Sequence, residues 1–165
     1  MNDVILRKAE KTDIEQLVNM RIAYLKEDLG EEVIHETSGI EKELADFFKK
    51  HLNVDIDAFV AEYKGEIIST SFTAYYYRLP HPDFPKGTAG IPINGYTKPM
   101  YRKLGLAGSL LKMSAEYASD KGVELLNMEV TEKGLPVSKE TGFKEIKYTP
   151  VQMILHNGKM QKKIT

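Results

Sequence analysis

Apolar residues at helical spacing predict two helices in the first third of the chain. Apolar positions recur every three or four residues over residues 14–29 and again over residues 40–52. Each stretch opens on a capping box, Thr12–Glu15 in the first and Ser38–Glu41 in the second. Gly30 is expected to end the first helix, because glycine readily takes the left-handed conformation that follows a last helical turn.

Apolar runs rich in β-branched and aromatic residues predict the strands. They cover residues 4–9, 58–63, 67–77, 89–97, 125–130, 143–149 and 151–155. The turn Lys64–Gly65 joins the second and third runs into an antiparallel hairpin. Gly95 is expected to mark a bulge within the fourth run, since Pro99 leaves too little chain for the returning strand of a hairpin.

Alternation along the third run separates two faces of the hairpin. Ile68, Phe72 and Tyr76 share one face, and the other face is rich in hydroxyl groups. The hydroxyl face comprises Ser69, Ser71, Thr73, Tyr75 and Tyr77. It either lines a polar groove or faces solvent, and the pattern leaves both interpretations open. The proline-rich loop over residues 78–88 is long for a hairpin connection and suits a lid or a substrate edge.

A third helix is expected from Leu106, directly after a short basic turn. Its apolar face comprises Leu106, Leu110, Met113 and Tyr117. Because strands precede and follow this helix, residues 89–97 and 125–130 should pair in parallel through a right-handed crossover. A fourth, short helix over residues 134–141 should end at Gly142. We expect one α/β (α+β) domain over residues 1–165, with residues 156–165 as a frayed tail.

Composition excludes several classes of protein. The 23 basic and 24 acidic residues of the 165-residue chain nearly cancel, so no global positive field favours nucleic acid. The absence of cysteine removes disulfides and thiolate metal sites, and it fits a reducing cytoplasm. No apolar run approaches the length of a membrane span, and the four histidines show no metal-ligand spacing. We therefore expect a cytoplasmic protein without metal, nucleic-acid partner or membrane.

The basic turn before the third helix has the features of an anion site. Gly105 and Gly108 let the backbone approach a ligand, and the free N–H groups of a first helical turn attract negative charge. The phosphate-loop spacings G-x-x-x-x-G-K-[ST] and G-x-G-x-x-G are both absent. The residues present are Arg102-x-x-Gly105-x-Ala107, directly after a strand. An ordinary connection from strand to helix is the alternative interpretation.

This motif resembles the acetyl-CoA motif of the GCN5-related N-acetyltransferases, whose pattern is Q/R-x-x-G-x-G/A. Gly142–Phe143 resembles the junction after the last helix of that family, and the order of the expected elements is similar across nearly the whole chain. The resemblance implies the family's fold, a mixed and mostly antiparallel sheet with a splayed parallel pair and flanking helices. It also implies that acetyl-CoA lies in the splay.

The resemblance assigns the cofactor site to the end of the fourth strand and the turn after it. The residues expected there are Gly95, Tyr96, Thr97, Arg102, Lys103, Leu104, Gly105, Leu106, Ala107, Gly108 and Ser109. Backbone groups of residues 95–97 would pair with the pantetheine arm as an added strand does. The N–H groups of residues 103–108 would bind the pyrophosphate.

Catalysis is where the sequence departs from the family. The resemblance implies direct attack of an amine on the thioester in a ternary complex, which needs a base and a proton donor. Many members carry a tyrosine acid four residues before the glycine of Gly142–Phe143, and that residue is Ser138 here, a far weaker acid. Tyr101 is a candidate acid. Glu129 is a candidate base, although an outward-facing strand residue explains it equally well.

The acceptor side is the least specified part of the sequence. Tyr24, Glu27 and Tyr75 are the candidate residues there. The acidic residues over 27–32 are interpreted as a linker between the first two helices, either a solvated loop or a surface that attracts a cationic amine. Neither the amine nor the oligomeric state follows from the sequence, and a homodimer through the sheet edge stays open.

Three functions compete at this stage. The leading hypothesis is an acetyl-CoA-dependent N-acetyltransferase acting on a primary amine of a small molecule or a peptide. A non-catalytic acyl-CoA-binding or regulatory module is the alternative that Ser138 suggests. A different nucleotide-binding enzyme, with another phosphate in the loop, is the third.

Overall fold

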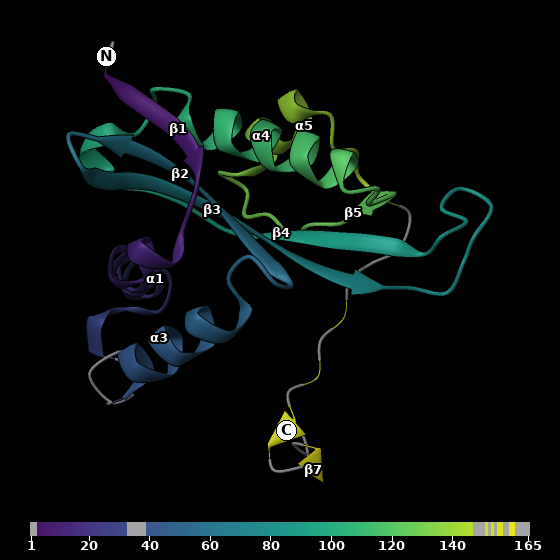
Figure 1. Ribbon diagram of the computed structural model, residues 1–165, viewed down its shortest axis with the longest axis horizontal. Coiled ribbons are helices and arrows are strands. Elements are labelled where there is room, and N and C mark those ends of the chain that lie inside the picture. Colours follow the sequence, from purple (N-terminus) through teal and green to yellow (C-terminus); the bar gives the residue numbers. More distant parts are fainter. Residues whose placement is uncertain are drawn as a thin grey trace.

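One mixed sheet organises the residues that the structure describes. This computed structural model describes residues 3–32, 39–146, 151, 153, 155–156 and 159–160. Within them, five strands form a sheet in the order β1-β2-β3-β4-β5 (Figure 1). The strands are β1 (Val4–Lys8), β2 (Ile56–Tyr63), β3 (Glu66–Tyr77), β4 (Thr88–Thr97) and β5 (Leu125–Leu126). Neighbours pair antiparallel except β4 and β5, which pair in parallel.

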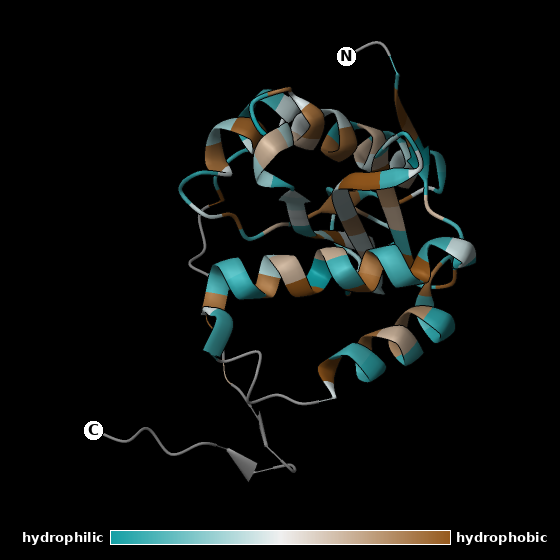
Figure 2. Ribbon diagram, turned by 90° about the vertical axis from the view of Figure 1, so that its left-hand side faces the viewer, coloured by the Kyte–Doolittle hydropathy of each residue, from teal (hydrophilic) through white to brown (hydrophobic). Residues whose placement is uncertain are grey.

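Helices cover both faces of the sheet. On one face lie α1 (Ile14–Leu29), which follows the 3₁₀ turn η1 (Lys11–Asp13), and α3 (Ile40–His51). On the other face lie α4 (Leu106–Asp120), which follows the 3₁₀ turn η2 (Pro99–Tyr101), and α5 (Leu135–Thr141) (Figure 2). The predicted α/β class, the mostly antiparallel sheet with one parallel pair and the flanking helices are confirmed. Among the described residues, no helix combines the length and apolar character needed to cross a membrane.

Alternation along β2 divides the interior into two apolar cores. Ala58 and Val60 pack toward α1 and α3, whereas Phe59 packs toward α4 with Leu110. These four side chains are 0% exposed. Full burial of a large apolar side chain contributes about 1.5–3 kcal/mol. The two cores therefore hold the sheet firmly between its helix layers.

A bulge at Ile68 reverses the predicted faces of the hairpin. Ser69 pairs with Ala61 and Ile67 with Glu62, so Ile68 has no partner in β2. Ile68 consequently packs under α4, while Phe72 packs under α1 and α3 on the opposite face. The prediction that these two side chains share a face was wrong, because simple alternation takes no account of an inserted residue.

A second bulge interrupts β4. Tyr96 pairs with Thr70 and Ile93 with Phe72, so two residues of β4, Asn94 and Gly95, oppose one residue of β3. Asn94 has a φ of 53°, a left-handed conformation that asparagine tolerates better than most residues. The predicted bulge is confirmed, with Asn94 rather than Gly95 in the left-handed conformation.

The start of α1 differs from the prediction. The capping interaction begins at Glu10, whose N–H donates to the Asp13 carboxylate at 2.8 Å. Asp13 is also paired with Arg7 at 2.7 Å. The capping box predicted to begin at Thr12 therefore begins two residues earlier. The cap predicted at Ser38 lies outside the described residues.

The C-terminal third also departs from the prediction. β5 holds only Leu125–Leu126 of the strand expected over residues 125–130. Residues 143–146, 151 and 153 belong to no strand, which contradicts the predicted last pair, and residues 147–150 lie outside the described residues. Within the tail, β6 (Leu155–His156) pairs antiparallel with β7 (Lys159–Met160), where a frayed end was expected. The short helix α5 and its terminal Gly142, with a φ of 106°, are as predicted.

Candidate active site

A groove of about 930 Å³ runs along the edge of β4 beyond the end of β5. Its walls are β4 over residues 92–97 and the chain over residues 128–134. Pairing of β4 with β5 covers only Ala89 and Gly90 of β4. Among the described residues, no strand pairs with this edge of β4 beyond that point, so the splayed pair becomes an open groove.

The groove ends at the start of α4. Gly105 is the residue before the helix, with a φ of 76°, and its carbonyl accepts from the Ser109 N–H at 3.0 Å. The N–H groups of Leu106, Ala107 and Gly108 therefore have no acceptor within the helix. A Cβ added at Gly105 would meet no atom within 4 Å. Free N–H groups beside open space at a helix start suit a phosphate.

Arg102 joins this loop to the end of α1. Its Nε donates to the Thr97 carbonyl at 2.9 Å, and its Nη2 donates to Glu27 at 2.5 Å. The hydrogen bond from Arg102 holds the pKa of the Glu27 carboxyl below its usual range. Glu27 and Asp28 belong to α1, so the acidic linker predicted over residues 27–32 was wrong for these two residues.

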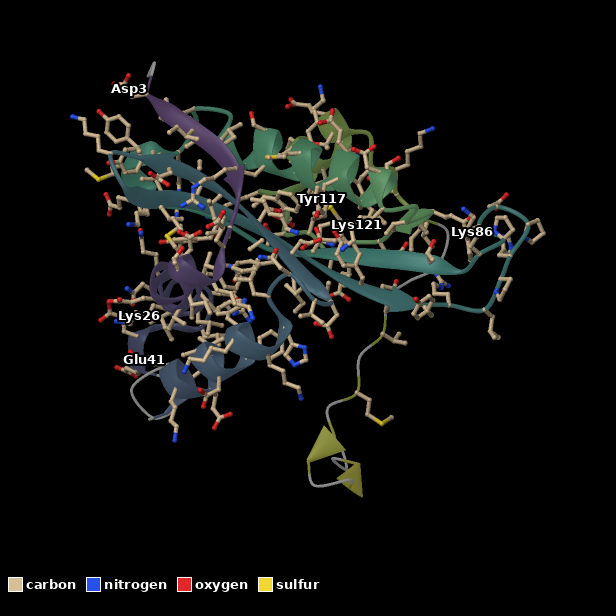
Figure 3. The ribbon with its side chains drawn as sticks, viewed as in Figure 1. Asp3, Lys26, Glu41, Lys86, Tyr117 and Lys121 are labelled. Carbon is tan, nitrogen blue, oxygen red and sulfur yellow. The ribbon has the colours of Figure 1, made fainter. Side chains whose placement is uncertain are left out.

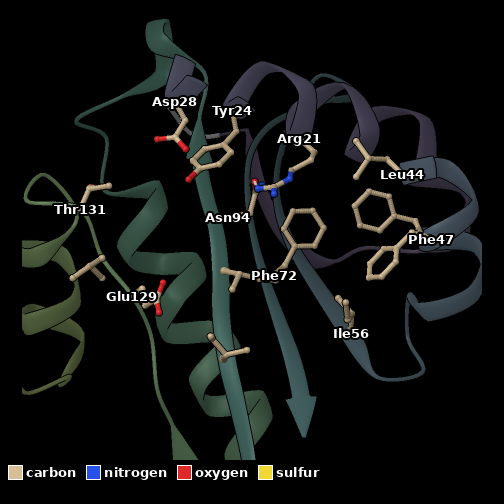
Figure 4. Close-up of a pocket in the computed structure, with 14 residues that line it drawn as sticks. Arg21, Tyr24, Asp28, Leu44, Phe47, Ile56, Phe72, Asn94, Glu129 and Thr131 are labelled. Carbon is tan, nitrogen blue, oxygen red and sulfur yellow. Dashed lines mark hydrogen bonds between the residues drawn. The ribbon is translucent and has the colours of Figure 1, made fainter. Parts of the chain in front are cut away.

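A second cavity, of about 670 Å³, lies on the α1 and α3 side of β4 (Figure 4). Its lining is mostly apolar: Leu44, Phe47, Phe48, Ile56, Phe72, Ile91 and Ile93. We call it the apolar chamber. Arg21 extends from α1 into its wall and donates to Asn94 Oδ1 at 2.5 Å (Figure 4). Burial lowers the pKa of the Arg21 guanidinium, and the charges of Tyr24 and Asp28 oppose this effect.

The groove and the apolar chamber meet at a junction. The residues that line both are Tyr24, Asp28, Ile93, Asn94, Glu129, Val130 and Thr131. The Tyr24 ring packs edge-on against Tyr96 with 6.3 Å between centroids. Asp28 and Glu129 bring two carboxylates to the junction, where they attract an ammonium group and can accept its proton. Among the described residues, no cluster of three or more His, Cys, Asp or Glu side chains could hold a metal.

Comparison with solved structures identifies the fold. A predicted acetyltransferase from Clostridium acetobutylicum, solved with acetyl-CoA, has a TM-score of 0.75 and 28% identity, covering 90% of this chain and 96% of its own. A GCN5-related N-acetyltransferase from Ralstonia eutropha has a TM-score of 0.74 and 18% identity, covering 90% and 97%. The chain has the fold of the GCN5-related N-acetyltransferases.

A third structure widens the range of relatives of this N-acetyltransferase fold. Glucosamine-6-phosphate N-acetyltransferase from Arabidopsis thaliana has a TM-score of 0.70 and 14% identity, covering 90% of this chain and 97% of its own. No protein-family model matches the sequence, and a search of curated proteins finds no relative. The similarity is therefore mainly one of three-dimensional structure.

Most residues expected at the cofactor site do line the groove. All of them are in its lining except Leu104 and Ser109. The Ser109 hydroxyl instead donates to the Gly105 carbonyl at 3.1 Å, within the first turn of α4. The order strand, basic turn and helix N-terminus thus brings these residues together as the sequence predicted.

The three candidates for catalysis lie in different places. Ser138 is 3% exposed and lines neither cavity, and its hydroxyl donates to the Leu135 carbonyl at 2.8 Å. This placement argues against Ser138 as a proton donor. Tyr101 lines the groove near the start of α4 and packs against Tyr63 with 6.2 Å between ring centroids. Glu129 lines both cavities.

The three candidates for the acceptor side also lie in different places. Tyr24 lines both cavities, and Glu27 lines the groove. Tyr75 lines neither cavity and lies under α4, with Lys121 Nζ 4.2 Å from its ring centroid, so the structure does not place it at the acceptor site. Burial and the Asp57 charge raise the pKa of the Tyr75 hydroxyl.

The open questions about the hairpin are also resolved. Ser69, Ser71 and Thr73 of the hydroxyl face are buried rather than solvent-facing, and Ser71 lines the groove. The loop over residues 78–88 lines neither cavity, so it forms no lid over them in this structure.

Sequence reasoning missed two polar residues of the apolar chamber, Arg21 and Asn94. Arg21 lies within the helical spacing of residues 14–29, and Asn94 directly precedes Gly95, where the bulge is predicted. A cation on an otherwise apolar helix face was the available signal for Arg21.

Proposed function

We propose that the protein is an N-acetyltransferase that moves the acetyl group of acetyl-CoA to a primary amine of a small molecule or a peptide. The proposal covers the whole chain as a single catalytic domain. Its main support is the groove that follows the unpaired edge of β4 and ends at the free N–H groups of α4. The acetyl-CoA complex of the Clostridium acetobutylicum protein supports the same ligand here.

The residues of the groove fit this co-substrate. Backbone groups of residues 95–97 would bind the pantetheine arm along the β4 edge. The N–H groups of residues 103–108 would bind the pyrophosphate, each charge-assisted hydrogen bond contributing about 1.5–3 kcal/mol. When bound, acetyl-CoA supplies an activated acetyl thioester. Overall, a C–N bond replaces the C–S bond, the sulfur ends as a thiol, and the ammonium releases one proton to solvent.

The proton transfers would be served by the residues at the junction. Glu129, exposed and shared by both cavities, would accept the proton of the ammonium group directly or through water. Tyr24 would be the donor to the leaving thiolate, because it lies at the junction whereas Tyr101 lies nearer the phosphate end of the groove. Holding both substrates in line would supply much of the rate.

Calorimetry with acetyl-CoA tests the cofactor site. Ala107→Glu places a carboxylate among the N–H groups at the start of α4 and should lower acetyl-CoA affinity by at least about tenfold. Ser119→Glu adds the same charge at an exposed position at the other end of α4 and serves as the control. Gly105→Glu is a poorer choice, because its φ of 76° would strain any side chain.

Two further measurements separate the competing functions. Binding of ATP or NAD in place of acetyl-CoA would indicate a different nucleotide-binding enzyme. Binding of acetyl-CoA without CoA release across a panel of amines would indicate the non-catalytic module. Amine-dependent release of CoA is the outcome that we expect.

A further inference from the structure

We propose that the acceptor is a free α-amino acid with a large apolar side chain, whose carboxylate binds Arg21 and whose side chain occupies the apolar chamber. This inference rests on the proposed function. It names the acceptor class from the three kinds of surface that converge beside the groove: a cation, an apolar wall and a pair of carboxylates.

The cation is Arg21. Its side chain is half-buried in the chamber wall, and the neutral Asn94 amide is its hydrogen-bond acceptor there. Among the described residues, no carboxylate lies within ion-pair distance of the Arg21 guanidinium, whereas Arg7 is paired with two carboxylates and Arg102 with one. A half-buried guanidinium without a carboxylate partner is costly, and its planar fork matches a carboxylate of a ligand.

The apolar wall lies beside Arg21. Leu44 and Phe47 come from α3 and Phe72 from β3, so a helix and a strand supply it together (Figure 4). Phe47 remains 42% exposed although it faces a cavity of about 670 Å³. A leucine or phenylalanine side chain would cover this surface, and removing its apolar area from water would favour binding.

The amine position lies at the junction. Asp28 and Glu129 line it, and the open groove continues from it toward the start of α4. The α-carbon of an amino acid carries an ammonium group, a carboxylate and a side chain on one tetrahedral centre. These three groups match the junction, Arg21 and the apolar wall, all of which border the apolar chamber.

Other amine classes satisfy only part of this surface. The N-terminal residue of a peptide has no free α-carboxylate for Arg21, and a polyamine would place a second cation near it. An amino sugar would set its hydroxyl groups against phenylalanine and leucine side chains, where they would lack partners. An apolar amino acid leaves none of these mismatches.

A substrate series tests the inference on the wild-type protein. CoA release would be measured with phenylalanine, phenylalaninamide, phenethylamine, alanine and a dipeptide that begins with phenylalanine. We expect the highest kcat/KM for phenylalanine, with alanine about 10-fold or more lower because the chamber stays unfilled. No CoA release with any amine, despite acetyl-CoA binding, would overturn the proposed function. Release that is equal for the acid and the amide would overturn only the present inference.

Two arginine variants test where the carboxylate of the amino-acid substrate binds. Arg21→Met should lower the ratio of kcat/KM for phenylalanine to that for phenylalaninamide by about 10- to 100-fold, the loss expected for a charge-assisted pair. This ratio cancels any general effect of the substitution on folding or acetyl-CoA binding. Arg78→Met removes a charge from the exposed loop after β3 and should leave the ratio unchanged. An unchanged ratio in Arg21→Met would refute the assignment.

The apolar wall has its own variant. Phe47→Ala should reduce the preference for phenylalanine over alanine about 10-fold, since it removes one side of the chamber. Equilibrium titration of phenylalanine into the CoA-saturated protein provides a second measurement that does not depend on turnover. A preference that survives Phe47→Ala intact would place the side chain elsewhere.

Discussion

At the scale of single residues, Asp57 is the most buried charged residue in the described part of the chain. Its side chain is 1% exposed, and its carboxylate pairs with Lys8 at 2.6 Å and Lys121 at 3.0 Å. Tyr117 belongs to α4 and Lys121 directly follows that helix, and Figure 3 shows both residues beside the sheet. Burial alone would raise the pKa of Asp57, but the hydrogen bonds from the two lysines outweigh it and lower the pKa.

This ion cluster should make stability depend on acidity. A lowered carboxyl pKa contributes stability above the unfolded value of about 4, and that contribution is lost as the pH falls through the folded value. Asp57→Asn should therefore lower the free energy of unfolding by about 3 kcal/mol near neutral pH, and by less in acid. Urea unfolding at several pH values measures it. Asp46→Asn, at an exposed pair with Lys49, should cost under about 1 kcal/mol. A loss of unfolding free energy that does not change with pH would contradict a stabilising role for the Asp57 charge.

The catalytic assignment is also a matter of single residues. Glu129→Gln should lower kcat by about 100-fold or more while acetyl-CoA affinity stays within twofold, because a general base acts on the reaction rather than on cofactor binding. Ser138→Ala is the matched comparison and should change kcat by less than about twofold, since its hydroxyl is bonded within α5. Steady-state kinetics measures kcat for both variants. A larger loss of kcat in Ser138→Ala than in Glu129→Gln would instead favour Ser138 as the residue that acts in catalysis.

At this scale the sequence motif covers most of the residues that line the end of the groove, but not the polar residues of the apolar chamber. Arg102 and Gly105 are close in the chain, so a linear motif could describe them. Arg21 and Glu129 lie far apart in the chain, and only the packing of α1 across β4 brings them to one cavity. Spacing along the chain carries no information about such a pair.

At the scale of elements, the two bulges decide which side chains face which cavity. The bulge at Ile68 changes the face of every later residue of β3, and the bulge at Asn94 places the Asn94 side chain beside Arg21. Element order, the parallel pair and the helices were predictable because apolar periodicity spans many residues. A one-residue insertion is too local to alter that periodicity. The prediction that Phe72 lies on the same face as Ile68 was therefore wrong.

The contact between α1 and the loop before α4 leads to a further prediction. Glu27 neutralises Arg102, which lies at the groove where the phosphates are proposed to bind. Glu27→Gln should free that guanidinium and raise acetyl-CoA affinity, by at most about fivefold because the ion pair is exposed. Calorimetry at low ionic strength measures the change, and added salt should remove it. Weaker binding in the variant would instead mean that Glu27 holds Arg102 in position.

At the scale of the whole molecule, the candidate site lies across the sheet rather than on one face of it. The groove borders α4 and the apolar chamber borders α1 and α3, so both helix layers must be in place before the junction forms. The site therefore depends on the complete fold, and ligand binding should stabilise all of it together.

Thermal unfolding tests this dependence. A ligand at about 100 times its Kd adds about 2.7 kcal/mol, which corresponds to a rise in Tm of about 5–10 °C for a chain of this size. Acetyl-CoA should produce this shift as one cooperative transition. Ala107→Glu should show about half of this shift or less at the same concentration, because a tenfold loss of affinity leaves about 1.4 kcal/mol of stabilisation. Ser119→Glu should behave as the wild type does. Two separate transitions, with only one moved by ligand, would show that the layers unfold independently.

The unpaired edge of β4 has one more consequence, for behaviour in concentrated solution. A strand edge that offers free N–H and C=O groups is a template for any extended segment, including one from another copy of the chain. Beyond Gly90 this edge has no strand partner among the described residues. The protein should therefore aggregate fastest when ligand-free, and saturating acetyl-CoA should slow aggregation by occupying the template. Bound co-substrate would therefore protect the unpaired strand edge from pairing with another copy of the chain.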